Sequence, residues 1–150
     1  MINKSLIVDE ARAWVGTRFH HQGRVKANGN NKGGCDCIGL IVGVADNVGL
    51  MYAGQKLSAY DRIDYAKIPY GNQLYNSFCE YLDEIRINDV QGGDVLMFKF
   101  DKDPQHVGIV GELDGDRTII HCYLQARGVV EHRLDKQWRQ RIVAAFRFKS

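Results

Sequence analysis

The stretch Gly34-Cys35-Asp36-Cys37-Ile38-Gly39-Leu40 decides how this chain folds, because a long apolar run begins within it. The run continues through residues 41–48 with few residues that interrupt a helix, which indicates a buried helix. Asp36 stands directly before it, in the position that an N-cap takes. Cys37 is therefore expected on the first turn, where free backbone N–H groups and the helix dipole favour a thiolate over a thiol. We interpret Cys37 as an activated nucleophile.

Cys35 is the alternative nucleophile, two residues earlier. Only Cys37 both follows an aspartate and precedes the pair Gly39-Leu40, so we assign the nucleophile to Cys37. Cys35 is interpreted as a small loop residue whose thiol is open to a mixed or regulatory disulfide. Cys79 lies on the apolar face of an expected helix and Cys122 on an expected strand, and both are interpreted as core residues.

Composition predicts one soluble domain spanning residues 1–150, with 45% hydrophobic and 25% charged residues. A net charge of +2 is too small to predict a nucleic-acid partner. No apolar stretch approaches the roughly 20 residues of a membrane span. Charged residues follow the first apolar ones too soon for a signal peptide, so we expect cytoplasmic synthesis without one. The four cysteines predict reduced thiols rather than a disulfide framework.

The N-terminal half reads as helices joined by irregular segments. Residues 5–15 show helical spacing of apolar side chains, and a polar, glycine-rich loop follows at 17–34. The helix that begins at Cys37 is expected to run to Asn47 or Val48. Residues 49–68 lack periodicity and predict an irregular segment, and a third helix is expected over 72–82.

The C-terminal half reads as short strands separated by turn residues. Strands are expected at 94–100, 106–111, 117–123, 128–134 and 142–148, with a short helical turn at 135–139. This pattern predicts a meandering antiparallel sheet of about five strands. Helices first and strands later predict an α+β fold, with N-terminal helices packed on a C-terminal sheet.

Two histidines are placed where they can serve a cysteine nucleophile. A thiol needs a nearby imidazole as its base, and that imidazole needs an orienting partner on its second nitrogen. His106 begins one apolar strand and His121 lies within the next, so adjacent antiparallel strands can bring the rings together. Packing of the Cys37 helix on that sheet would then bring all three residues to one place. His132 has no comparable setting and is interpreted as a surface residue.

A zinc site is the alternative use of these thiols and imidazoles. Cys35 and Cys37 form a Cys-x-Cys pair, which does not match the Cys-x₂₋₄-Cys clips of structural zinc, and no second clip exists. We therefore predict no metal site.

Four segments, in order, resemble those of NlpC-type papain-like cell-wall cysteine peptidases. Asp36-Cys37-Ile38-Gly39-Leu40 resembles the family's Asp-Cys-(Ser/Thr)-Gly-Leu signature. The three that follow are Gly93-Asp94-Val95-Leu96-Met97-Phe98, His106-Val107-Gly108-Ile109-Val110 and Ile119-Ile120-His121-Cys122. The resemblance covers the whole chain, and it implies the papain-like form of the α+β fold.

The flanking segments resemble the phage tail-associated branch of that family. They are residues 16–24, 128–131, 138–139 and 145–148. Members of this branch are tail-tip components that open peptidoglycan locally during DNA entry. The resemblance therefore implies a peptidoglycan stem peptide as substrate, phage tail proteins as partners, and action on the cell wall from a virion or tail.

The resemblance also implies a mechanism. Cys37 would be the nucleophile, His106 the general base and acid, and His121 the residue that orients His106. The reaction would be hydrolysis of an amide bond in the stem peptide through an acyl-enzyme, without a metal or a cofactor. The backbone N–H of Cys37 is expected to bind the oxyanion, since it points from a helix N-terminus.

Two positions depart from the family pattern around Asp36. The family often has an upstream tyrosine whose hydroxyl faces the cysteine, and Phe19 stands there, so His20 or His21 would have to donate instead. Ile38 replaces the serine or threonine that follows the cysteine. Two alternatives to the peptidase therefore remain: a catalytically weakened structural tail-tip protein, and a related thiol amidase or acyltransferase.

Overall fold

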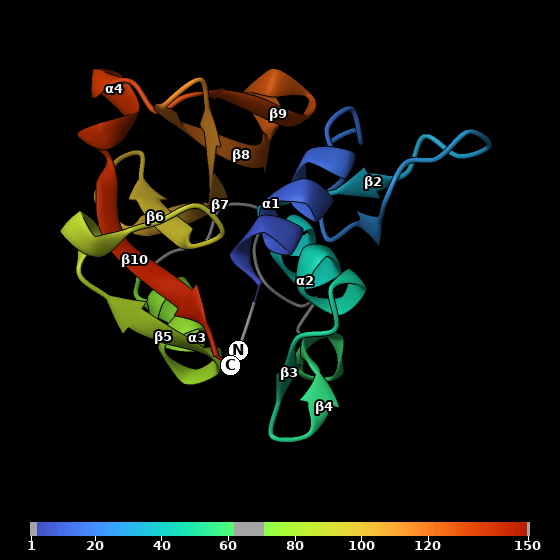
Figure 1. Ribbon diagram of the computed structural model, residues 1–150, viewed down its shortest axis with the longest axis horizontal. Coiled ribbons are helices and arrows are strands. Elements are labelled where there is room, and N and C mark those ends of the chain that lie inside the picture. Colours follow the sequence, from blue (N-terminus) through green and yellow to red (C-terminus); the bar gives the residue numbers. More distant parts are fainter. Residues whose placement is uncertain (1–2, 62–70, 150) are drawn as a thin grey trace.

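A computed structural model describes residues 3–61 and 71–149 and shows helices packed against a six-stranded antiparallel sheet (Figure 1). The helices are α1 (Lys4–Ala13), α2 (Cys37–Asn47), α3 (Gln73–Tyr81) and α4 (Lys136–Arg139). The sheet contains β5 (Leu82–Ile85), β6 (Val95–Lys99), β7 (Pro104–Leu113), β8 (Asp116–Tyr123), β9 (Gly128–Arg133) and β10 (Ile142–Phe148). The predicted α+β class is confirmed.

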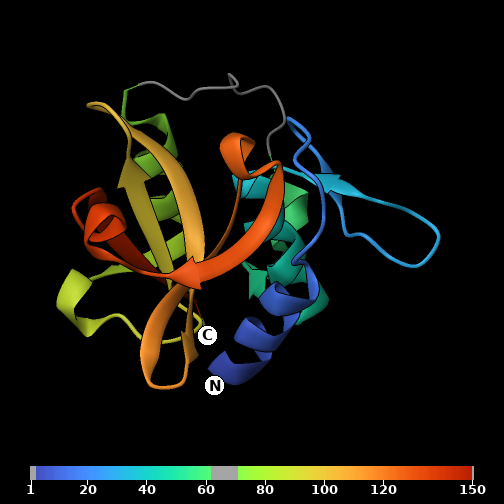
Figure 2. The ribbon, with the colours of Figure 1, turned by 90° about the horizontal axis from the view of Figure 1, so that it is seen from above.

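The sheet has the strand order β5-β10-β6-β7-β8-β9. Strands β6 to β9 form the predicted meander, but β10 returns to the far side of β6, so the sheet is not a simple meander. The predicted number of about five strands is also corrected, because β5 adds a sixth at the edge, with Leu82 paired to Phe148. Its sequence, Leu82-Asp83-Glu84-Ile85, is short and charged in the middle, as edge strands often are. Figure 2 shows the long strands curving strongly beside α1 and α2.

Shorter elements occupy the segments that were expected to be irregular. The loop at 17–34 contains a two-stranded hairpin formed by β1 (Arg24–Val25) and β2 (Gly34–Cys35). Another hairpin, β3 (Met51–Tyr52) with β4 (Gln55–Lys56), precedes a 3₁₀ turn at Leu57–Tyr60. Residues 62–68 of the predicted irregular segment lie outside the described residues. Two further 3₁₀ turns cover Ile87–Asp89 and Leu124–Ala126.

Helix α2 begins where the sequence predicted. The Asp36 carboxylate accepts a hydrogen bond of 2.8 Å from the backbone N–H of Gly39, which makes Asp36 the N-cap. The apolar side of α2 is fully buried between α1 and the sheet. Within the described residues, no helix is both long enough and apolar enough to cross a membrane.

Helices α1 and α2 touch closely at Gly43. A Cβ atom at Gly43 would lie 2.3 Å from the indole of Trp14, which is 1% exposed. The indole is held in turn by a hydrogen bond of 2.9 Å from its Nε1 to Glu10. The glycine therefore sets how closely the two helices approach.

Replacing Gly43 by alanine is expected to lower the free energy of unfolding by about 1–2 kcal/mol, because the cost of overpacking exceeds the gain in helix propensity. Urea denaturation measures the change. Gly29→Ala is the matched control, since a Cβ at Gly29 meets nothing within 4 Å. Equal stability of the Gly43 and Gly29 variants would contradict the close packing of α1 on α2.

Candidate active site

The Cys37 thiol lies where the first turn of α2 meets strand β7. The residue is half-buried, and its sulfur accepts hydrogen bonds from the backbone N–H groups of Ile38 and Val107. The pairing between β7 and β8 ends at Ile109 and Ile120. Val107 lies beyond that last pair, so its N–H serves the sulfur instead of the sheet.

The electrostatic environment of Cys37 differs from the one expected at a helix N-terminus. Burial, followed by the negative charge of Asp36, raises the pKa of the Cys37 thiol to about 12. The N–H groups of Val107 and Ile38 and the charge of Arg24 act in the opposite direction but are outweighed. The predicted resting thiolate is therefore wrong, because loss of solvent around the sulfur exceeds the effect of the helix terminus.

His106 and His121 lie side by side, as predicted, but on the face of the sheet opposite to the cluster that contains Cys37, so the expected meeting of all three residues is not observed. Nε2 of His106 and Nδ1 of His121 are 2.6 Å apart, and both residues are buried. Gly108 provides the space between the two strands: a Cβ there would lie 2.9 Å from Cβ of His121. Glycine at this position thus lets β8 bring the His121 ring close to the start of β7.

His132 is a third member of this cluster, which the sequence interpretation missed. Its Nε2 lies 2.8 Å from Nε2 of His121, and its Nδ1 lies 2.7 Å from the carbonyl oxygen of Arg133. The residue is half-buried rather than on the surface. The β8–β9 register pairs His132 with Ile119, which puts its side chain on the same face as His121. The alternation of side chains between the two faces of the strand at 128–134 was the available signal. Its use required the pairing register of β8 and β9, which one sequence does not provide.

Aromatic rings enclose the imidazoles on the same face of the sheet. The ring of Trp138 lies 4.8 Å from that of His121, at 90°, and the ring of Tyr123 stacks on it at 4.6 Å. Trp138 is placed by α4, whose N-cap Asp135 accepts from the Trp138 N–H at 3.0 Å. The predicted helical turn at 135–139 is confirmed, and it forms a wall of the site.

The enclosure keeps the histidines neutral. Burial, with a smaller contribution from neighbouring imidazoles, lowers the pKa of His106 to about 3 and that of His121 to about 2. At neutral pH each ring therefore carries one proton and has one bare nitrogen.

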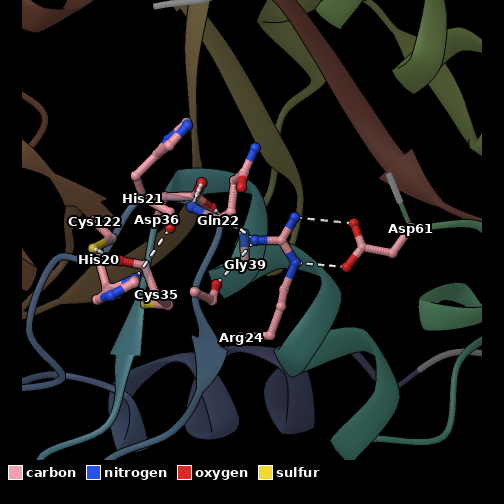
Figure 3. A network of polar contacts seen from close by, with 10 residues as sticks. His20, His21, Gln22, Arg24, Cys35, Asp36, Gly39, Asp61 and Cys122 are labelled. Atoms are coloured by element: carbon pink, nitrogen blue, oxygen red, sulfur yellow. Dashed lines mark hydrogen bonds and ion pairs between the residues drawn. The ribbon is translucent and has the colours of Figure 1, made fainter. Parts of the chain in front are cut away.

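Asp36 joins the segments around the helix terminus rather than standing free (Figure 3). Besides Gly39, it accepts from the backbone N–H of Gln22 at 2.8 Å and from Arg24 at 3.1 Å. Arg24 also forms a two-pronged ion pair with Asp61. Both carboxylate oxygens of Asp36 are thus bonded within the protein.

The upstream residues considered as donors to the oxyanion, Phe19, His20 and His21, lie on the segment beside β2. Phe19 is partly buried in the same apolar cluster as Cys37, and its backbone bridges to Cys35. His20 is exposed, with its Nδ1 3.0 Å from the carbonyl oxygen of His21. Figure 3 shows the side chains of His20 and His21 extending in opposite directions.

The remaining cysteines have structural surroundings, with two corrections. Cys35 belongs to the buried strand β2 rather than to a loop, and its carbonyl accepts from the Cys122 thiol at 3.1 Å. Cys122 is buried, as predicted. Cys79 is exposed, because α3 buries Leu74 and Phe78 instead. All four thiols are free, and the described residues contain no cluster of three or more side chains suited to a metal ion.

The sequence pattern of the NlpC/P60 family matches residues 16–147. The chain belongs to this family. No protein of curated function matches the chain.

Solved structures of the same fold agree with this assignment. A NlpC/P60 family protein from Bacillus cereus ATCC 10987 has a TM-score of 0.65 and 17% identity, covering 98% of this chain and 40% of that one. NlpC2 from Trichomonas vaginalis has a TM-score of 0.61 and 14% identity, covering 100% and 48%. A N-acetylmuramoyl-L-alanine amidase from Bacteroides uniformis ATCC 8492 has a TM-score of 0.60 and 12% identity, covering 98% and 99%. The chain thus spans less than half of the first two.

The buried neutral histidines make stability depend on pH. Below pH 6.5 the unfolded chain binds protons that His106 and His121 cannot accept until the pH approaches 3 and 2. The free energy of unfolding is therefore expected to fall as the pH falls from 6.5 towards 3, with no contribution from these residues above that range. Urea denaturation from pH 7.5 to 4.5 measures the slope.

The variant His106→Gln is expected to flatten this slope, because it removes one of the groups that titrates only after unfolding. Gln137→Leu, at an exposed position of α4, is the control and should keep the wild-type slope. A wild-type slope in His106→Gln would show that His106 is not held neutral by burial.

Proposed function

We propose that this NlpC/P60 chain is a cysteine peptidase that hydrolyses amide bonds in the stem peptides of bacterial peptidoglycan. The observation that carries the proposal is that the thiol at the start of α2 contacts the backbone N–H of Val107. Val107 is the residue after His106, which forms a buried pair with His121. Membership of the family supports it, and so does the fold shared with a protein named as an N-acetylmuramoyl-L-alanine amidase.

In the proposed mechanism the thiol loses its proton only as it reacts. The high pKa of Cys37 and the low pKa of His106 make the neutral pair the resting form. Nε2 of His106 is engaged with His121, which leaves Nδ1 to take the thiol proton. Within the described part of the chain the resting thiol makes no hydrogen bond to His106, because the sulfur packs with the helix-side cluster and the imidazole lies with Trp138 on the other face of the sheet. The proposed proton transfer therefore requires a rearrangement at the start of β7.

The bonds then change in two steps. The Cys37 sulfur attacks the amide carbonyl, and the tetrahedral intermediate collapses as His106 gives its proton to the leaving amine. Water, deprotonated by His106, attacks the thioester, which releases the acid and restores the thiol. The backbone N–H of Cys37 is assigned to the oxyanion, since Phe19 offers no hydroxyl.

The setting that we propose is a phage or prophage tail. The support is the resemblance of residues 16–24, 128–131, 138–139 and 145–148 to tail-associated members of the family. Tail proteins would then be the docking partners, and the cell wall the place of action after assembly.

A catalytically weakened structural tail protein is the second candidate. Phe19 in place of a hydroxyl donor and the raised pKa of Cys37 favour it. If this candidate is right, purified sacculi should release no fragments. If the protein is an acyltransferase, product should form only when an acceptor amine is added.

Cys37→Ala and His106→Ala are each expected to lower hydrolysis of purified sacculi by about 10³-fold or more, since nucleophile and base act as a unit. His121→Ala should reduce the rate but leave measurable turnover, because orientation is only part of the catalytic effect. Mass spectrometry of released fragments gives the rate and identifies the bond. Intact stems indicate cleavage next to the sugar, and truncated stems indicate cleavage within the peptide.

Cys79→Ala is the matched control, because Cys79 is exposed and distant in sequence from the site. It should retain wild-type activity. Cys35→Ser is a poorer control because Cys35 is fully buried. Full activity in Cys37→Ala would exclude the proposed nucleophile.

A further inference from the structure

Three imidazoles form a continuous chain that ends on a backbone carbonyl. The contacts run from Nε2 of His106 to Nδ1 of His121 at 2.6 Å, and from Nε2 of His121 to Nε2 of His132 at 2.8 Å. The last runs from Nδ1 of His132 to the carbonyl oxygen of Arg133 at 2.7 Å. The two inner contacts join nitrogen to nitrogen, so in each of them one nitrogen must carry the proton and the other must be bare.

The Arg133 carbonyl oxygen fixes which nitrogen donates in each hydrogen bond between the three rings. A carbonyl only accepts, so Nδ1 of His132 must carry the proton of that ring. Nε2 of a neutral His132 is then bare and accepts from Nε2–H of His121. Nδ1 of His121 is bare in turn and accepts from Nε2–H of His106. The position of the proton on each ring therefore follows from the hydrogen bond between Nδ1 of His132 and the Arg133 carbonyl.

The outcome at the other end is a bare nitrogen at Nδ1 of His106. In the opposite direction, Nδ1 of His106 would carry a hydrogen and have no lone pair with which to take a proton from a thiol. Burial of His106 and His121 keeps both rings neutral, which removes the alternatives in which either of these two rings carries an extra proton.

We propose that His132 is a positioning residue that, through His121 and the Arg133 carbonyl, holds His106 in the tautomer whose Nδ1 is free to act as base. The catalytic importance of this tautomer rests on the proposed function, whereas the tautomers themselves do not. When Nδ1 of His106 takes the thiol proton, the new positive charge faces the bare Nδ1 of His121, whose own Nε2–H remains directed at His132.

Two neighbouring rings pack against the ring of His132. Its ring lies 4.8 Å from that of His121 and 5.5 Å from that of Trp138. The contacts given for His132 are thus these two rings and its hydrogen bonds to His121 and to the Arg133 carbonyl.

The tautomers are measured by ¹H–¹⁵N correlation spectra of the histidine rings in the full chain at pH 7.5. Protons are expected on Nδ1 of His132, on Nε2 of His121 and on Nε2 of His106. A proton on Nε2 of His132 would overturn the proposal whether or not the protein hydrolyses peptidoglycan.

Two variants separate tautomer control from packing. His132→Leu removes the acceptor for His121, and His132→Gln supplies an amide oxygen in its place. We expect His132→Leu to lower kcat/KM on sacculi, and the alkylation rate of Cys37 by iodoacetamide, by about tenfold, the effect of one hydrogen bond. His132→Gln should recover both to within about threefold and keep the proton of His121 on Nε2.

Equal losses in His132→Leu and His132→Gln, with unchanged tautomers at His106 and His121, would overturn the proposal in favour of a packing role. Gln137→Leu is the matched control for adding leucine near α4, and should leave both rates unchanged. If wild-type protein releases no fragment although the expected tautomers are present, the proposed function is refuted, and with it the catalytic role of the three hydrogen-bonded histidines.

Discussion

The Asp36 carboxylate helps to determine where the proposed nucleophile stands, because it forms hydrogen bonds with three parts of the chain around the start of α2. It caps α2 through Gly39, fixes the preceding loop through the N–H of Gln22, and holds the Arg24 guanidinium. A cap that accepts several hydrogen bonds leaves little freedom at the first helical residue. Cys37 is that residue, so its sulfur is directed at the start of β7. The same carboxylate adds to the larger effect of burial in raising the pKa of the thiol.

The site keeps its reacting groups neutral by excluding water from both. The thiol belongs to the apolar cluster under the helices, whereas the imidazoles belong with Trp138 on the other face of the sheet. The two environments adjoin at the backbone of His106 and Val107. A neutral pair costs less to bury than an ion pair, because neither member has to be removed from water as a charge. A site of this kind holds the thiol in its protonated form, and the proposed hydrolysis would require proton transfer at the moment of attack.

The sequence predicted those parts of the fold that depend on local pattern. The cap, the start of α2, the strands from 94 to 148 and the approach of His106 to His121 all follow from residues close together along the chain. Strand β5 and the return of β10 depend instead on which edges are left to pair, which is a property of the assembled sheet. The pKa of Cys37 was misjudged for a related reason: a helix terminus is visible in a sequence, but the burial of its side chain is not.

The missed contribution of His132 and the missed crossover of β10 have a common origin in α4. The chain leaves β9 just after His132, turns through α4, and returns as β10 on the far side of β6. That route carries Trp138 across the face that bears His106 and His121, with ring distances of 6.0 and 4.8 Å. A simple meander would have left this face open to water, and the imidazoles would then compete with solvent for every hydrogen bond. The crossover therefore places Trp138 over the hydrogen-bonded rings, and the strand order contributes in this way to the burial that keeps His106 and His121 neutral.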